Sequence, residues 1–432
     1  MEGGINLSRS YVMATSELTK CIVTGSDNLI RVVNLGDLYP SAFLNDPKEE
    51  KKFQRKPFVI NFCEDSGMVQ LKYVHEYDDM FKDYWYRSAT NAQMRKSLRD
   101  IVNSTLDKHS CHVADWLDIA CNDGTLSKIV KDINGNIRVV GVDPALNLNH
   151  SGSDVFVNDY FSSTSVKAAV GENVKFDVIT NIAMFYDLQS PHGFLEGVRE
   201  LLSPSGIYVI QMTDLWGMLK SNAVDNFCHE HVAYYSLAVM DKLLKQHGLE
   251  IFDVEYNLTN GSSLRLYICH PGAYERREMV DMMIEYQKKD ITEKAIVEWY
   301  NNNICRNLYI FKRWLERQKK DGKSIALIGA STKGNTLLQM CDIDNKLIDY
   351  AMELSEFKFG KYTLGSNIPI VDERVIMNPM RVDKPDICVA AIWHFKDSIL
   401  KNFNKYIQDG GSVLFPLPKP MLYTKTGVVE IK

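Results

Sequence analysis

The sequence predicts an α/β protein of two or three domains, and three observations support this. The chain has 432 residues, which is too many for a single hydrophobic core. Its hydrophobic fraction of 45% and charged fraction of 24% are ordinary for globular proteins. From about residue 114, β-branched apolar runs alternate with amphipathic segments, a pattern typical of a parallel sheet with helices on both faces.

Charge and cysteine content exclude several classes of protein. The net charge of -5 lacks the basic excess of a dedicated nucleic-acid-binding protein. The nine cysteines are scattered and include no CxxC pair, which favours a reducing compartment over a disulfide framework. The first twenty residues lack a signal-peptide core, and the apolar runs are too short to span a bilayer. We expect a cytoplasmic protein that binds neither nucleic acid nor a membrane.

The first ninety residues show little regular pattern. Short apolar stretches at 29–35 and 58–62 flank the charge-dense segment 46–56, which we interpret as a solvated loop. Residues 91–108 place apolar side chains at helical spacing.

The central part of the chain predicts a seven-stranded sheet. Ser236 is the expected N-cap of a helix that Gly248 ends. The turn signal Asn260-Gly261 separates the last two strands, which we expect to form an antiparallel pair. Helices are expected at 126–133 and 191–202. The predicted strands are 114–120, 137–143, 153–159, 175–181, 206–212, 249–256 and 263–269.

The last third of the chain predicts a second, smaller α/β domain. Residues 275–320 are polar, aromatic and helical, and we interpret them as a connecting helix pair. Further helices are expected through 337–340 and near 397–408. The strands predicted here are 324–330, 347–354, 386–393 and 412–417.

Ligands of an open parallel sheet bind at the carboxyl ends of its strands. The first central strand ends in DIACNDGTL, residues 118–126, where small residues let a ligand approach the backbone. The second strand ends at Asp143-Pro144, where a carboxylate can accept both ribose hydroxyls. The glycine fingerprint of a dinucleotide-binding fold is incomplete, which favours a different nucleotide-containing ligand.

This arrangement resembles the class I S-adenosylmethionine methyltransferases, whose Rossmann-like, seven-stranded sheet ends in an antiparallel pair. DIACNDGTL is similar to their first motif, with Ala120 where the family usually has Gly. The resemblance implies that Asp143 holds the ribose, that Asp159 and Tyr160 flank the adenine, and that Asn181 faces the methionine moiety. The residues it assigns to S-adenosylmethionine are Asp118, Ala120, Asn122, Asp123, Gly124, Asp143, Pro144, Asp159, Tyr160, Asn181 and Tyr86.

A narrower resemblance rests on motifs spread over nearly the whole chain. CHEH at 228–231, followed by Tyr234-Tyr235-Ser236, is similar to the HEHxxYxS signature of the three-domain sugar C-methyltransferases. Further similar stretches are YWYRS at 84–88, MFYDL at 184–188, GASTKGNT at 329–336 and AIWH at 391–394. The resemblance implies a small N-terminal domain (1–90), a methyltransferase domain (91–285) and a C-terminal Rossmann-like α/β domain (286–432).

The same resemblance implies a small-molecule substrate, a nucleotide-diphosphate keto-sugar methylated on a carbon beside its ketone. Removal of the α-proton requires a base, and an imidazole suits this task near neutral pH. By this resemblance we assign His231 as the general base and Glu230 as its partner or as the second proton-transfer group. The residues expected to contact the sugar nucleotide are Tyr84, His229, Tyr234, Lys333, Asn335 and His394.

Several motifs leave alternatives open. GASTKGNT has Gly-x4-Gly, but Asn335 stands where a phosphate-loop lysine belongs, so we do not expect ATP hydrolysis. Lys333 binds the diphosphate, or the segment is a plain strand-to-helix turn. Tyr84 and Tyr86 either cover the cofactor or hold domains together. On a strand, His229 and His231 would share one face, and without a helical i, i+4 pair we expect no metal there.

The N-terminal domain departs from the family, which holds zinc there with two CxxC pairs. The matching positions here are Cys21 with Thr24 and Cys63 with Ser66. Hydroxyls are poor ligands for a structural zinc site, so zinc is not expected. Two alternatives to sugar C-methylation remain: methylation of an oxygen or nitrogen acceptor, and a catalytically silent binding protein that kept the fold.

Overall fold

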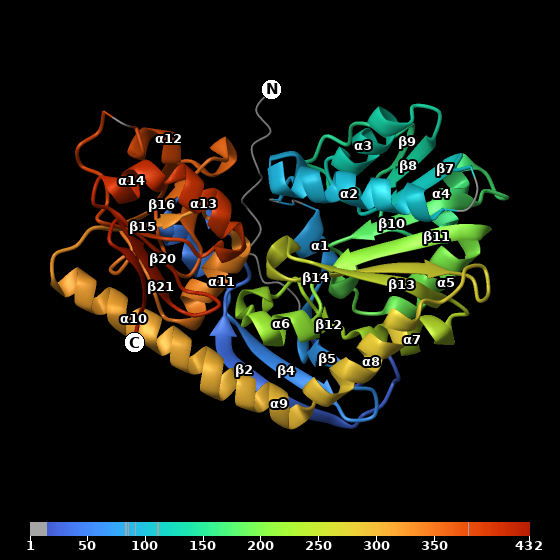
Figure 1. The fold of residues 1–432 in the computed structure, drawn as a ribbon, viewed down its shortest axis with the longest axis horizontal. Coiled ribbons are helices and arrows are strands. Elements are labelled where there is room, and N and C mark those ends of the chain that lie inside the picture. Colours follow the sequence, from blue (N-terminus) through green and yellow to red (C-terminus); the bar gives the residue numbers. More distant parts are fainter. Residues whose placement is uncertain (1–14, 83, 85, 91, 110–111, 379) are drawn as a thin grey trace.

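The structure is a computed structural model that describes residues 15–432 except 83, 85, 91, 110–111 and 379. Trp85 of the YWYRS motif and Cys111 lie outside the described residues. Two α/β units face each other, with the sheet of the N-terminal segment below them (Figure 1). Among the described residues, no helix is both long and apolar enough to cross a membrane.

The central unit contains a seven-stranded sheet with the order β13-β14-β11-β10-β7-β8-β9. All neighbouring strands are parallel, except that β14 runs antiparallel to both β11 and β13. The predicted strand count and the closing antiparallel pair are therefore confirmed. The strands are β7 (Asp115–Ile119), β8 (Arg138–Val142), β9 (Val155–Val157), β10 (Phe176–Ile182), β11 (Leu202–Met212), β13 (Glu250–Asn257) and β14 (Ser263–Cys269).

Helices cover both faces of this sheet, because each helix has one apolar stripe. On one face, α2 (Ala92–Lys108) and α3 (Thr125–Ile133) pack in a cluster around Trp116. On the other face lie α4 (Ser163–Val170), α5 (Pro191–Leu201) and α7 (Leu237–Gln246). Ser236 caps α7 by accepting from the Val239 amide, and Gly248 follows its end at φ 63°, both as predicted.

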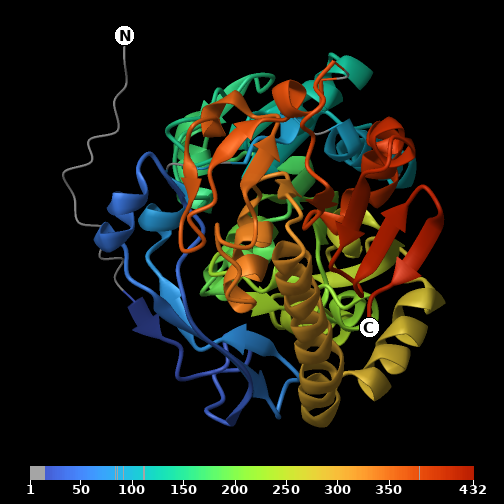
Figure 2. The same ribbon diagram turned by 90° about the vertical axis from the view of Figure 1, so that its left-hand side faces the viewer.

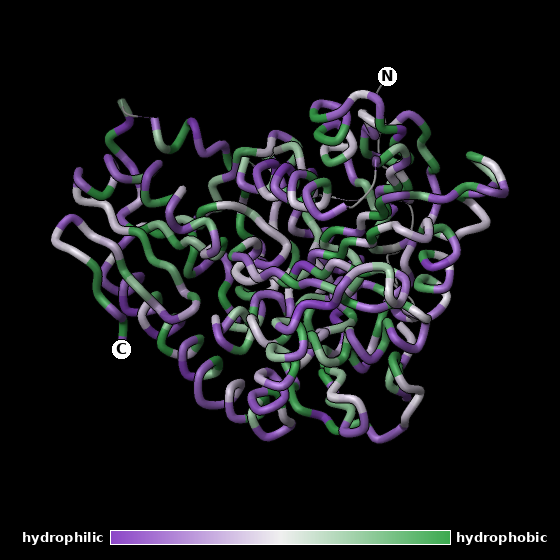
Figure 3. Tube along the Cα trace, turned by 45° about the vertical axis from the view of Figure 1, so that its right-hand side comes forward, coloured by the Kyte–Doolittle hydropathy of each residue, from purple (hydrophilic) through white to green (hydrophobic). Residues whose placement is uncertain are grey.

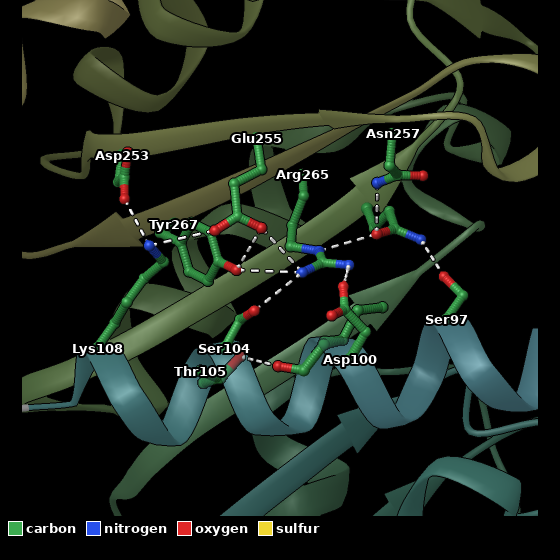
Figure 4. Close-up of polar contacts among 12 residues, drawn as sticks. Ser97, Asp100, Ser104, Thr105, Lys108, Asp253, Glu255, Asn257, Arg265 and Tyr267 are labelled. Atoms are coloured by element: carbon green, nitrogen blue, oxygen red, sulfur yellow. Dashed lines mark hydrogen bonds and ion pairs between the residues drawn. The ribbon is translucent and has the colours of Figure 1, made fainter.

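Hydrogen bonds and ion pairs around a buried arginine connect α2 to the antiparallel strands β13 and β14 (Figure 4). The guanidinium of Arg265, on β14, donates to Gln211 Oε1, Glu255 Oε2 and Asp100 Oδ2 at 2.8–2.9 Å. The Nζ of Lys108 donates to Asp253 Oδ2 at 2.7 Å beside it. Since a buried charge must be paired to be tolerated, this network fixes the helix against the sheet.

The N-terminal segment forms a four-stranded sheet with the order β12-β5-β4-β2. Its own strands are β2 (Leu29–Leu38), β4 (Lys56–Cys63) and β5 (Val69–Leu71), while β12 (Ala233–Tyr234) comes from the central unit. A separate pair joins β1 (Thr15–Glu17) to β6 (Tyr73–His75). The segment 46–56 is solvated as predicted, with no buried residue, but it is not a loop throughout, because Asp46 caps a short helix, η1 (Pro47–Lys52), that reaches the cavity described below.

Two tight turns occupy the positions of the degenerate zinc motif. The Gly25 amide donates to Cys21 O and the Gly67 amide to Cys63 O, each at 2.8 Å. The Sγ of Cys21 lies 3.3 Å from the Ser66 hydroxyl. The described part of the chain contains no group of three or more His, Cys, Asp or Glu residues arranged to hold a metal. Absence of zinc stays a prediction.

Helices along one side of the molecule connect the two α/β units (Figure 1). They are α8 (Glu278–Asp290), α9 (Glu293–Glu298) and α10 (Arg306–Lys320), and a π-helical segment, η6 (Trp299–Cys305), makes α9 continuous with α10. Ile296, Trp299 and Phe311 belong to one apolar cluster with side chains of the N- and C-terminal segments. The connecting helices are therefore part of a shared core.

The C-terminal unit also has a seven-stranded sheet, with the order β18-β16-β15-β19-β20-β21-β22 (Figure 2). The last two strands are antiparallel and the others parallel. Four strands were predicted, namely β15 (Ile325–Ile328), β16 (Tyr350–Glu353), β19 (Ile387–Val389) and β20 (Ser412–Phe415). No strands were predicted at the positions of β18 (Ile370–Asp372), β21 (Met421–Thr424) and β22 (Gly427–Glu430).

The C-terminal unit is joined to the N-terminal segment by a short strand pair, β17 (Tyr362–Thr363) with β3 (Phe43–Leu44). Its helices are α11 (Thr332–Met340), α12 (Glu373–Ile376), α13 (Lys396–Asn402) and α14 (Asn404–Gln408). Hydrophobic stretches run mainly through the interior of the molecule and hydrophilic ones along its outer loops and helices (Figure 3). The three segments thus surround a common space.

Candidate active site

A cavity of about 1420 Å³ is lined by residues of all three segments. The last residues of β7, β8 and β10 (Ile119, Val142 and Ile182) line it, so it lies at the carboxyl ends of the central strands, where ligands of such sheets bind. The residues predicted from sequence that line it are Asp118, Ala120, Asn122, Asp143, Pro144, Asp159, Tyr160, Tyr84, Tyr86, Glu230, His231 and Lys333.

The turn after β7 opens onto the cavity through left-handed backbone. Ala120 has φ 57° and Asn122 has φ 53°. The Asn122 amide donates to Asp143 Oδ2 at 2.8 Å, and the Ala145 amide donates to Asp143 Oδ1 at 2.9 Å. Burial raises the pKa of Asp143, although these two hydrogen bonds oppose the shift. The two loops thereby fix a carboxylate at the cavity wall.

Asp123 and Gly124 do not line the cavity and instead support the turn. Asp123 Oδ2 accepts from the Ala89 amide at 2.9 Å. A Cβ on Gly124, which has φ 76°, would lie 1.8 Å from the Ser151 carbonyl oxygen, so only glycine fits there. The side chain of Asn122 bonds the Ser88 amide and the Tyr86 carbonyl at 3.0 and 3.1 Å, and so holds the segment that carries Tyr86 beside the turn.

Of three further residues predicted to bind the cofactor, two line the cavity and one does not. Asp118 lines the cavity with Oδ1 bonded to Thr180 and Oδ2 buried without a partner, and burial raises its pKa to about 7. Asn181 is fully buried, donates to Ile119 O at 3.4 Å, and does not line the cavity. The structure therefore does not bring Asn181 to the place expected for it. Tyr160 does lie at the cavity, and its hydroxyl donates to Asp78 at 3.0 Å.

The HEH motif lies in a turn and not on a strand. The His231 amide donates to Cys228 O at 3.1 Å, and the chain enters β12 two residues later. In this turn Glu230 and His231 line the cavity, whereas His229 points toward the N-terminal segment. The expectation that the two histidines share a face is wrong, because the turn rotates them apart.

The imidazole of His231 is anchored at one nitrogen. Its Nδ1 lies 2.8 Å from the Asn226 carbonyl oxygen and must donate to it, so the neutral ring carries its lone pair on Nε2. The ring packs against Tyr186 with centroids 4.1 Å apart. Burial, together with the charge of Lys333, lowers the pKa of His231 to about 3. The ring is therefore neutral at neutral pH, and its Nε2 is unprotonated.

Two carboxyl groups and one ammonium line the cavity together with this imidazole. Asp187 is 6% exposed and lines the cavity together with Glu230, and one oxygen of each is buried without a hydrogen-bond partner. Burial raises both pKa values, and the charge of Lys333 opposes this. The Nζ of Lys333, from the first turn of α11, donates to Asn226 Oδ1 at 2.5 Å.

Four residues predicted to bind substrate do not line the cavity. His229 contacts His75 Nε2 at 3.1 Å and Leu38 O at 3.3 Å, and Tyr234 packs edge-on against Phe227 in the core. The side-chain Nδ2 of Asn335 donates to Leu364 O, and its Oδ1 accepts from the Ser366 hydroxyl. His394 packs against Phe395 with its Nδ1 buried and unpartnered. Since these side chains face protein atoms, they do not contribute to the cavity surface.

The cavity also exposes residues to which sequence reasoning gave no role. Asp187 and Tyr186 belong to the MFYDL stretch, and their position just after the carboxyl end of a central strand was the available signal. No comparable signal marked the contributions of the N- and C-terminal segments, because they depend on packing between distant parts of the chain. Among the unassigned polar residues are Glu49, Lys52, Asp187, Tyr186, Cys228 and Lys361.

Comparisons with known proteins agree with this geometry. A family described as "Methyltransferase domain" matches residues 90–254, and one described as "C-methyltransferase C-terminal domain" matches residues 258–418. The C-methyltransferase NovU of Streptomyces niveus is 26% identical over 413 residues, which cover 93% of this chain and 96% of NovU.

Solved methyltransferase structures resemble part of the chain. An S-adenosylmethionine-dependent methyltransferase from Clostridium acetobutylicum is 15% identical, with a TM-score of 0.34, and the match covers 41% of this chain and 92% of that one. The plantazolicin methyltransferase BpumL, solved with S-adenosylhomocysteine, is 12% identical with the same TM-score, and the match covers 42% of this chain and 87% of that one.

The strand order and the matched domain define a class I S-adenosylmethionine-dependent methyltransferase. The matched C-terminal family and NovU are both described as C-methyltransferases, and together they support an S-adenosylmethionine-dependent C-methyltransferase.

The residues at the cavity fit the methyl donor that this class uses. Asp143 offers a fixed carboxylate for hydroxyl groups, and Tyr160 an aromatic face for a base. Asp118 offers a buried oxygen without a partner. S-adenosylmethionine supplies an activated methyl group when bound, and the side chains that would hold it are those of the turn after β7 and of the ends of β8 and β9.

Proposed function

We propose that the protein transfers a methyl group from S-adenosylmethionine to a carbon beside the ketone of a nucleotide-diphosphate keto-sugar, with His231 as general base. The observation that carries this proposal is the orientation of the imidazole. Nδ1 is held by the Asn226 carbonyl, and Nε2 has no hydrogen-bond partner among the described residues of the cavity that His231 lines.

Carbon methylation needs a proton acceptor more than oxygen methylation does, because a C–H bond must first be broken. The neutral His231 ring would take the α-proton, and the carboxylate of Glu230 would compensate the positive charge that forms. A positioned general base contributes roughly 10²–10⁴ in rate. The rest of the acceleration comes from holding the enolate carbon in line with the sulfonium methyl group.

The size and charge of the cavity support a large anionic substrate. Its volume of about 1420 Å³ exceeds the 300–1,000 Å³ typical of small-molecule sites. Lys361 beside β17 lines the same cavity, as does Lys52 of η1, which also pairs with Glu49 at 2.9 Å, and a diphosphate would meet their ammonium groups. Tyr84 lines it as well, and we assign it to the sugar nucleotide.

The competing functions are methylation of an oxygen or nitrogen acceptor, and binding without catalysis. Silent binding is disfavoured by the cluster around His231, because the unpartnered buried oxygens of Asp187 and Glu230 destabilise the folded protein and have no structural use. An oxygen or nitrogen acceptor would not require an α-proton to be removed.

The test compares His231→Ala with His192→Ala, which removes a half-buried imidazole paired with His247 away from the cavity. Turnover of a thymidine-diphosphate 4-keto-6-deoxy sugar should fall by about 10²–10⁴ in His231→Ala only. Calorimetric affinity for S-adenosylmethionine should stay within about twofold, because only the base is lost. Near-normal turnover in His231→Ala would exclude the assignment.

A further inference from the structure

Asp187 is a buried acid with no structural partner for one of its oxygens. It ends the short helix η3 (Phe185–Asp187), which follows β10 at the carboxyl edge of the sheet. The side chain is 6% exposed, lines the cavity, and leaves Oδ1 without a hydrogen-bond partner. Such a group is costly in a folded protein, which points to a role toward a bound molecule.

Glu230 lines the same cavity, and its Oε2 is also buried and unpartnered. Its carboxylate acts on Asp187 as a like charge, and the cation that opposes the burial of both groups is Lys333. Two buried carboxyl groups facing one ammonium cannot both be ionised without leaving an uncompensated negative charge. This arrangement favours one proton held by the pair.

We propose that Asp187 is a catalytic residue whose protonated carboxyl group donates a hydrogen bond to the keto oxygen of the substrate and stabilises the enolate. Glu230 remains ionised and faces the imidazolium of His231. The inference rests on the proposed function, since it names the group that stabilises the intermediate of that reaction.

The environment places the proton on Asp187 rather than on Glu230. Burial and the carboxylate of Glu230 raise the pKa of Asp187 well above its ordinary value, while Glu230 is raised by burial alone and relieved by hydrogen bonding from Cys228. A carboxylic acid kept neutral in an apolar site is an effective donor to a developing oxyanion. The titratable groups that face the pair are Tyr84, Tyr186, Cys228, His231, Tyr234 and Lys333.

In the proposed step, a proton and electron pairs move between the substrate, His231 and the methyl donor. The α C–H bond breaks, its proton moves to Nε2 of His231, and its electron pair forms the enolate double bond. The keto oxygen gains the negative charge and accepts the hydrogen bond from Asp187. The enolate carbon then bonds to the methyl group, the methyl–sulfur bond breaks with its electrons left on sulfur, and the ketone re-forms.

The protonation state can be tested without a substrate. Infrared difference spectra between the wild-type protein and Asp187→Asn at pH 7 should show a protonated carboxyl band that shifts in D2O and is lost in the variant. The exposed control Asp397→Asn should leave this band unchanged. Absence of the band would overturn the proposal about Asp187, whatever the substrate is.

The catalytic role is tested by exchange of the substrate α-hydrogen with D2O, using a thymidine-diphosphate 4-keto-6-deoxy sugar and S-adenosylhomocysteine. Asp187→Ala should slow exchange by about 10²–10³, whereas Asp187→Asn, which keeps a neutral donor, should remain within about tenfold of wild type. Binding of S-adenosylhomocysteine reports whether each variant is folded.

Two outcomes separate this proposal from the proposed function. Exchange at the wild-type rate in Asp187→Ala, or equal loss in the Asn and Ala variants, would contradict the role of Asp187 and leave the proposed function intact. Absence of exchange and of methyl transfer in the wild-type protein would instead contradict the proposed function.

Discussion

The ammonium of Lys333 lies 2.5 Å from Oδ1 of Asn226, and the backbone carbonyl of Asn226 accepts the Nδ1–H of His231 at 2.8 Å. One residue of the central unit thus connects a lysine of the C-terminal unit with the proposed base. The sequence suggested that Lys333 binds a diphosphate, but this contact places its ammonium next to the proposed reacting groups.

Replacement of Lys333 by Met should therefore affect kcat more than KM. The variant leaves Asp187 and Glu230 without the cation that faces both of them. We expect kcat to fall by about 10², comparable to the loss of one charge-stabilising group, with KM for the sugar nucleotide changed by less than about threefold. Steady-state kinetics check this, with Lys401→Met on the exposed side of α13 as control. A tenfold rise in KM at constant kcat would instead support diphosphate binding.

Replacement of Ala120 by glycine should lower the free energy of unfolding less than the same replacement of an alanine inside a helix. At φ 57° its side chain is strained by about 1–2 kcal/mol, which offsets the roughly 0.4–1 kcal/mol that glycine costs through the unfolded chain. Ala120→Gly should leave the free energy of unfolding unchanged or raise it by up to about 1 kcal/mol, and should tighten S-adenosylmethionine binding.

The matched control is Ala168→Gly, an exposed position inside α4, which should lose about 1 kcal/mol. Urea unfolding and calorimetry measure both quantities. Equal destabilisation by the two substitutions would contradict the interpretation of Ala120 as strained.

The N-terminal turns should accept zinc once their thiolates are restored. Burial opposes ionisation of Cys21, but hydrogen bonds from Ser66 and Thr24 outweigh it and lower the pKa of this thiol. Thr24→Cys combined with Ser66→Cys should give a protein that carries one zinc ion per chain, because four thiolates would then meet the tetrahedral requirement. Metal analysis of the purified wild-type protein should find none. Stoichiometric zinc in the wild type, or none in the double variant, would contradict this account of the site.

The pair His75 and His229 should make the protein sensitive to acid. Burial, and for His229 also its neighbour His75, lowers the pKa values to about 4 and about 3. Because these values lie below that of an unfolded histidine, about 6.5, the unfolded chain binds more protons between pH 6.5 and 4. Stability is therefore complete above pH 6.5 and falls by about 1.4 kcal/mol per pH unit for each ring as the pH decreases.

His229→Asn should reduce the dependence of the unfolding free energy on pH by the share of one titrating ring. Urea unfolding at pH 7, 6 and 5 measures this dependence. The exposed His112→Asn should leave the slope as in the wild type. A slope that is equal in all three proteins would show that the pair does not titrate in this way.

The sequence was sufficient for the central sheet and insufficient for the side chains around the cavity. Long β-branched runs and the cap at Ser236 predict the seven strands of the central sheet and α7, because local preference and burial agree there. The strands β18, β21 and β22 are short, and two of them are half exposed or more, so their apolar pattern is weak. Tertiary pairing, not local preference, forms them.

The candidate site shows the same division. Ala120, Asp143 and Glu230 follow strand ends or a motif, and they line the cavity, while their roles stay predictions. His229 was misplaced because a turn, which spacing alone did not reveal, rotates it away from His231. Asp187 was passed over because one carboxylate in a hydrophobic stretch gives no sign of the partner that Glu230 provides from elsewhere in the chain.

The most direct test of carbon methylation is the bond that the new methyl group makes. The protein is incubated with S-adenosylmethionine carrying a ¹³C methyl group and a thymidine-diphosphate 4-keto-6-deoxy sugar labelled with ¹³C in the ring. A carbon–carbon coupling from the methyl to the ring carbon beside the ketone, with loss of that carbon's hydrogen, is the result we expect. A methyl group without such coupling, bonded to oxygen or nitrogen, would contradict the account.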